Sequence, residues 1–269
     1  MRSMELIVGG LGPAARLVAT AWREAWGAMI LASVSLGGLL IAADFGPGWR
    51  GAWLAATLLA TLAAQGALYR LALARPGIGP GGLQWARAEW RLAAVWLLSA
   101  LFMAILGLLL FILLLASAYA VASAGAGFVA SEPATWAAAV DGRGRFALGA
   151  VAAVGLAALL WARLRLSLGS AASVARGRVQ VLSAWPITRG RALSMAVGVV
   201  LVGLGPVLLL AALASGTPFV AGKSAAVRDL ADLAEGLVIA GLWLPLDAGL
   251  MSYFYRRLAA DQPDSPAAP

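Results

Sequence analysis

Long apolar stretches without charged residues alternate with short basic segments along this chain. A helix needs about 20 apolar residues to cross the ~30 Å hydrocarbon core of a bilayer, because each residue adds about 1.5 Å. Six stretches reach or approach this length, so the pattern predicts an all-α membrane protein with six transmembrane helices. The predicted spans are residues 25–43, 51–69, 93–122, 146–163, 192–215 and 236–255.

Basic residues are concentrated on one predicted side of the membrane. Loops rich in Arg and Lys remain cytoplasmic, and 15 of the 20 basic residues fall in the N-terminal segment, the second and fourth loops and the C-terminal tail. Six of them are arginines between Trp161 and Arg191, a stretch without an acid. We therefore expect a multi-pass protein of a bacterial inner membrane with both termini in the cytoplasm. Residues 1–258 are predicted to form one membrane domain, and 259–269 a disordered tail.

A basic stretch with tryptophan precedes each odd-numbered predicted span. Gly-Leu-Gly-Pro at 10–13 is echoed by Gly-Ile-Gly-Pro at 77–80, 67 residues later, and Trp-Arg at 22–23 by Trp-Arg at 90–91. This rhythm predicts three transmembrane hairpins, each introduced by an amphipathic helix at the cytoplasmic face. Chance matches in a chain rich in Ala, Gly and Arg are the alternative to an evolved repeat.

Residues 171–185 show the amphipathic pattern most clearly. At about 100° per residue, polar side chains gather on one arc and apolar ones on the other, which fits a helix lying in the headgroup plane. Arg178 is the exception, because it falls in the apolar arc. Either Arg178 extends to the interface, or Gly177 breaks the helix, or Arg178 has a partner buried among the helices. We favour the first two interpretations.

Composition agrees with a membrane protein and removes several classes of chemistry. Hydrophobic residues make up 62% and charged residues 12%, against about 25% charged in soluble domains. The absence of cysteine and histidine excludes thiolate metal sites, disulfides, His-ligated haem and histidine-based catalysis. The net charge of +8 is typical of basic cytoplasmic loops. We expect no enzyme activity, no cofactor, no metal and no nucleic-acid partner.

Asp247 is an acid well inside a predicted span. A carboxylate at mid-helix costs about 2.5–3.5 kcal/mol, so its presence there suggests a function. It could pair structurally with an arginine, which we favour, or belong to a transport site with Gln65 as polar companion. The arginines considered as partners are Arg70, Arg163, Arg165 and Arg178. The candidate intramembrane polar site comprises Asp247, Arg178 and Gln65.

The arginines of the fourth loop are the predicted contacts with anionic lipid headgroups or with another membrane protein, at about 1 kcal/mol per basic residue. The candidates are Arg163, Arg165, Arg176, Arg189 and Arg191. The preferred function is a non-catalytic scaffold, accessory subunit or lipid-interacting component. The alternative is a transporter or permease subunit, in which Pro206, Pro245 and Asp247 mark a broken-helix site.

Several short motifs carry a resemblance to a known group of proteins. They are RLSL at 165–168, AASVA at 171–175, SAW at 183–185, TRGR at 188–191 and YRRL at 255–258. This pattern resembles bacterial six-helix inner-membrane proteins similar to the membrane domain that precedes some glycerophosphodiester phosphodiesterase domains. The resemblance implies the six-helix topology and no active-site residues.

Overall fold

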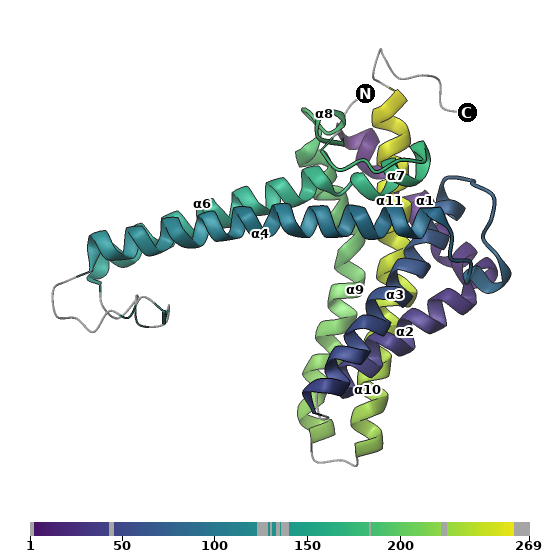
Figure 1. Cartoon of the computed structure of the whole chain (residues 1–269), viewed down its shortest axis with the longest axis horizontal. Coiled ribbons are helices and arrows are strands. Elements are labelled where there is room, and N and C mark those ends of the chain that lie inside the picture. The colour runs from purple at the N-terminus through teal and green to yellow at the C-terminus, as the bar shows by residue number, and fades with distance from the viewer. Residues whose placement is uncertain are drawn as a thin grey trace. The chain divides into compact units, whose positions relative to one another are not determined.

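The computed structural model describes residues 3–42, 46–122, 129, 131–132, 135, 140–182, 184–221 and 225–260, and these residues form helices, turns and loops without a strand. This confirms the all-α prediction for the described part. The chain divides into two compact units, which are coloured by residue number in Figure 1. Unit 1 comprises Met1–Trp96 and Ser167–Pro269, and unit 2 comprises Leu97–Leu166.

Six helices of the described part are long and apolar enough to cross a membrane, and five of them overlap predicted spans. This is compatible with an integral membrane protein. The difference lies at the N-terminus. The predicted span 25–43 is helix α2 (Trp26–Ile41), with 16 residues, whereas the sixth candidate, Met4–Glu24, is α1 (Ser3–Glu24), which we expected at the interface.

Most of the remaining long helices coincide with the apolar stretches of the sequence, and short helical segments lie between them. They are α3 (Pro47–Ala72), η2 (Pro80–Gly82), α4 (Arg87–Val121), α6 (Gly142–Leu166), α7 (Gly169–Arg176), α8 (Ala184–Ile187), α9 (Ala192–Ala221), α10 (Ala225–Val238), η3 (Ile239–Trp243) and α11 (Leu244–Ala260). Pro47 begins α3, at a position where its missing N–H costs no intrahelical hydrogen bond. The predicted disordered tail overlaps the end of α11, and its residues from 261 onward lie outside the described part.

Unit 2 is a hairpin made by α4 from residue 97 onward and by α6 (Figure 1). The two helices meet closely at Gly155, where an added Cβ would overlap the side chain of Leu110. Most of its large apolar side chains are exposed, among them Leu101, Leu108 and Val154. Such exposure is costly in water, so the hairpin is suited to a hydrocarbon environment.

Unit 1 is built around the helical run of α10, η3 and α11, which contacts α1, α2, α3 and α9. Small residues allow the backbones to approach, as in other membrane helix pairs. An added Cβ at Gly236 of α10 would overlap the backbone of α2 at Ser33 and Gly37. In the same way, the position of a Cβ at Gly249 of α11 lies 2.8 Å from Cα of Ala14 in α1.

The predicted amphipathic helix over 171–185 is shorter in the structure. Helix α7 ends at Arg176, because Gly177 adopts a left-handed conformation with φ of 65°. This supports the favoured interpretation, in which Gly177 breaks the helix and leaves Arg178 outside it. Ser173 and Gln180, which belong to the polar arc of the predicted helix, are buried. Burial is tolerated because the backbone N–H of Gln180 donates a hydrogen bond to Oγ of Ser173.

Candidate functional site

A buried ion pair joins the end of α3 to the first turn of α4. Nη1 of Arg70 lies 2.6 Å from Oε1 of Glu89, and the two side chains are 5% and 0% exposed. The other carboxylate oxygen of Glu89 accepts the backbone N–H of Ala86 at 2.7 Å, and Nη2 of Arg70 donates to the Gln84 carbonyl at 3.2 Å. Gly66 provides the space, because an added Cβ there would overlap Oε1 of Glu89. The pair thereby fastens the loop after α3 to the end of that helix.

This pair was not predicted from the sequence. Arg70 was considered as a partner of Asp247, whereas the structure pairs Arg70 with Glu89. A usable signal was present, because Glu89 is the one acid in the basic stretch 70–91. A lone acid among arginines is a candidate for an ion pair wherever apolar flanks predict burial.

Four arginines gather around the ends of α3, α7 and α11 and the start of α4. We call Arg75, Arg91, Arg176 and Arg256 the arginine cluster. Three of them donate hydrogen bonds to neutral groups, namely Arg75 to the Ala175 carbonyl (2.6 Å), Arg176 to the Tyr255 hydroxyl (3.1 Å) and Arg256 to the Ala72 carbonyl (2.9 Å). The fourth, Arg91, places Nη1 3.6 Å from where a Cβ of Gly177 would lie.

The segment after α7 holds Arg176 in place. The left-handed Gly177 reverses the chain, so that the backbone N–H of Gln180 reaches Oγ of Ser173 at 2.8 Å. The side-chain oxygen of Gln180 then accepts a long hydrogen bond of 3.5 Å from Nη1 of Arg176. Together with the hydroxyl of Tyr255, this contact fixes the guanidinium group from two sides.

The five arginines predicted to contact headgroups are divided between the two units. In unit 1, Arg176 and Arg189 are exposed and Arg191 is half-buried. In unit 2, Arg163 is exposed, while Arg165 is half-buried with its guanidinium 5.1 Å from the centre of the Trp161 ring. Their binding to lipids stays a prediction. Arg75, Arg91 and Arg256 were absent from that set, because their proximity to Arg176 depends on contacts between distant segments.

Arginines lie near both ends of the long helices of unit 1. Arg50 is exposed near the start of α3, and Arg70 lies 20 residues later in the same helix, a separation of about 30 Å along the axis. Likewise, Arg228 near the start of α10 and Arg256 near the end of α11 lie at opposite ends of one helical run. Because Arg256 of the cluster donates to the carbonyl of Ala72, two residues after Arg70, this arginine lies about one hydrocarbon thickness away from Arg50.

The three residues of the predicted intramembrane polar site occupy different settings. Asp247 is half-buried in the first turn of α11. Gln65 is half-buried in α3, and its side-chain oxygen is buried without a hydrogen-bond partner among the described residues. Arg178 is exposed beyond the end of α7. A joint action of these three residues stays a prediction.

The helical run is irregular immediately before Asp247. Segment η3 (Ile239–Trp243) is a π-helix, and Pro245 follows it. Pro245 has no N–H to offer to the carbonyl of Gly241, four residues earlier. The indole N–H of Trp22 in α1 donates to this carbonyl at 2.9 Å. A side chain from the neighbouring helix thus supplies a hydrogen bond that the proline cannot.

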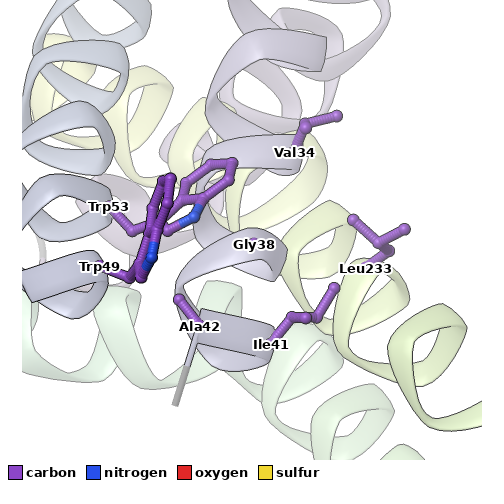
Figure 2. Close-up of a pocket in the computed structure, with 7 residues that line it drawn as sticks. All are labelled: Val34, Gly38, Ile41, Ala42, Trp49, Trp53 and Leu233. Atoms are coloured by element: carbon purple, nitrogen blue, oxygen red, sulfur yellow. The ribbon is translucent and has the colours of Figure 1, made fainter. Parts of the chain in front are cut away.

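A pocket of about 410 Å³ lies between α2, α3 and α10. Figure 2 shows Trp49 and Trp53 of α3 on one side and Leu233 of α10 on the other. Its lining residues are all apolar: Val34, Gly38, Ile41, Ala42, Trp49, Trp53 and Leu233. Such a lining suits an apolar group.

The described part of the chain has no group of three or more acidic, histidine or cysteine side chains placed to hold a metal ion. The candidate site is the arginine cluster with the buried ion pair beside it. The resemblance to the membrane domain associated with glycerophosphodiester phosphodiesterases stays an expectation from the sequence. Comparison of the chain with models of known protein families, with curated proteins and with solved structures gave no match.

Proposed function

We propose that this chain is a non-catalytic, lipid-interacting membrane protein of a bacterial inner membrane, whose basic end contacts anionic headgroups. One observation carries the proposal. The hydrogen-bond partners that the described residues offer to Arg75, Arg176 and Arg256 are neutral, while Glu89, the acid of the stretch 70–91, is buried against Arg70. The positive charge of the cluster thus remains available to an anion.

Arginine is well suited to this role. Its guanidinium group has five N–H donors in one plane and keeps its charge at any physiological pH. Hydrogen bonds to one or two neutral acceptors leave several donors free for phosphate oxygens. Each basic residue near a membrane surface with anionic lipids contributes about 1 kcal/mol of attraction.

Reconstitution tests this proposal. The purified protein would be placed in nanodiscs of phosphatidylcholine with a minor fraction of phosphatidylglycerol, and the lipids retained after extraction would be counted by native mass spectrometry. We expect enrichment of phosphatidylglycerol over phosphatidylcholine, and a decrease of this enrichment at high salt because ions screen exposed charges. Equal retention of the two lipids would contradict the proposal.

A transporter or permease subunit is the second candidate, favoured by the π-helix and Pro245 immediately before Asp247. π-helical segments occur frequently at functional sites, and interrupted helices line transport sites. Proton flux into proteoliposomes, followed with a pH-sensitive dye, would test it. Asp247→Asn should abolish flux with normal assembly if this candidate is right, whereas Glu235→Gln in the same helical run should leave it unchanged. A folded protein without flux in the unsubstituted form would exclude proton transport.

A further inference from the structure

We propose that Arg75, Arg91 and Arg176 form a binding site for one phosphate group of an anionic phospholipid. This inference rests on the proposed function, which requires only that the basic end of unit 1 attracts anionic lipids. The phosphate would have a defined position with three named arginines as its ligands, and other exposed arginines would not be equivalent to them.

The three arginines converge on one short piece of backbone. Arg75 follows α3 and donates a hydrogen bond of 2.6 Å to the carbonyl of Ala175, the residue before Arg176. Arg91 belongs to the start of α4 and lies beside Gly177, the residue after Arg176. Two guanidinium groups from separate segments therefore flank the end of α7, and the third arginine, Arg176, is the last residue of that helix.

The site is held in shape before any ligand arrives. Arg176 contacts Tyr255 and Gln180, and both of these residues are buried, with 8% and 5% of their surface exposed. Gln180 is fixed in turn by the fully buried Ser173. A side chain that is already ordered loses less entropy on binding, so Arg176 is the best-prepared of the three to bind a phosphate.

Charge explains why an anion would stabilise this arrangement. Guanidinium groups that converge on the end of α7 repel one another, and the hydrogen-bond partners of Arg75 and Arg176 given above are two carbonyl or amide oxygens and a hydroxyl. A phosphate diester brings one negative charge and two unesterified oxygens that accept hydrogen bonds from several donors at once. Binding would relieve the repulsion and use the donors that remain.

The position of the site favours a lipid headgroup over free phosphate. Arg91 follows Trp90, which is 66% exposed, and the ring of Trp90 meets that of Trp85 edge-on with 5.6 Å between ring centres. Exposed tryptophans mark the level of the headgroups in membrane proteins. Leu92, directly after Arg91, begins the apolar part of α4. The phosphate of a lipid would thus meet the arginines while its chains lie along the spans.

Paired variants in nanodiscs containing phosphatidylglycerol and phosphatidylcholine test the site. The double variant Arg75→Gln/Arg176→Gln removes two of the three charges. Arg91→Gln removes the third without breaking a hydrogen bond to any residue that the structure describes, so it serves as a second variant if the double variant misfolds. Arg228→Gln is the matched control, because it removes an exposed arginine at the far end of the same unit. Retained phosphatidylglycerol per protein is counted by native mass spectrometry.

We expect Arg91→Gln to lower the affinity for phosphatidylglycerol about fivefold and the double variant about 25-fold, with Arg228→Gln unchanged. Inorganic phosphate at millimolar concentration should not displace the lipid. Equal losses in cluster and control variants, unchanged retention in the cluster variants, or displacement by inorganic phosphate would each overturn the site while leaving the proposed function intact. If the unsubstituted protein shows no preference for phosphatidylglycerol, the proposed function itself fails.

Discussion

Arg70 and Glu89 form an ion pair of 2.6 Å whose side chains are almost completely buried. Glu89 also accepts the N–H of Ala86, and Arg70 donates to the carbonyl of Gln84. The pair therefore satisfies backbone groups of the loop in addition to joining two helices. Breaking such a pair by removing one partner leaves an uncompensated charge in the interior, which is more costly than losing the contact itself.

Glu89→Gln should lower the free energy of unfolding by about 3–5 kcal/mol, because the buried guanidinium of Arg70 loses its counter-charge. Unfolding in mixtures of sodium dodecyl sulfate and a mild detergent would measure it. Glu235→Gln, which removes a half-buried carboxylate of α10, should change the value by less than about 0.5 kcal/mol. Similar losses in both variants would show that the pair has no special role.

Gly66→Ala should also destabilise the protein, because the new methyl group would overlap Oε1 of Glu89. Overpacking of this kind costs about 1–3 kcal/mol. Gly51→Ala in the same helix is the control, since nothing lies within 4 Å of its added Cβ, and it should stabilise α3 by about 0.5–1 kcal/mol. Opposite signs for two identical substitutions in one helix are the expected result of the unfolding measurement.

Trp22→Phe should cost about 1–2 kcal/mol, because it leaves the carbonyl of Gly241 without the indole donor. The cost should fall by half or more in a Pro245→Ala background, where residue 245 regains an N–H for that carbonyl. A double-mutant cycle measures this coupling. Trp26→Phe, at a residue that is 55% exposed, should show no coupling to Pro245→Ala. Additive effects of Trp22→Phe and Pro245→Ala would contradict the explanation.

The orientation predicted from the basic loops can be tested by thiol labelling, because the chain has no cysteine of its own. A membrane-impermeant maleimide applied to intact spheroplasts should label Gly48→Cys, at an exposed position near the start of α3. Arg178→Cys, at an exposed position beyond α7, should react only after lysis, because loops rich in arginine remain cytoplasmic. The reverse pattern would invert the topology.

Apolar length predicted most of the helices, and the difference from the structure concerns the first two. The sequence rule looked for windows without charge, and Arg16 and Arg23 excluded α1. Both arginines are exposed in the structure, so they do not prevent the opposite face of α1 from packing. That face consists largely of small residues, such as Gly10 and Ala14, which contact α11. A hydropathy average over a sequence window does not detect a helix face that is buried only because a partner helix packs against it.

The candidate site was predictable in part. The excess of arginine identified Arg176, because charge is visible in the sequence. Its partner Tyr255 is 79 residues away, and Ala175, the partner of Arg75, is 100 residues away. Such pairings follow from the packing of whole helices and leave no local pattern. Glu89 was missed for a related reason, since its burial depends on the space that Gly66 provides.

The contact between α1 and η3 joins two parts of the chain that are synthesised at different times. Trp22 and its acceptor Gly241 are separated by 219 residues, and ribosomes add about 5–20 residues per second. The acceptor of Trp22 is therefore synthesised on the order of ten seconds or longer after α1. Unit 1 is thus complete only when η3 and α11 have been synthesised, because both of them contact α1.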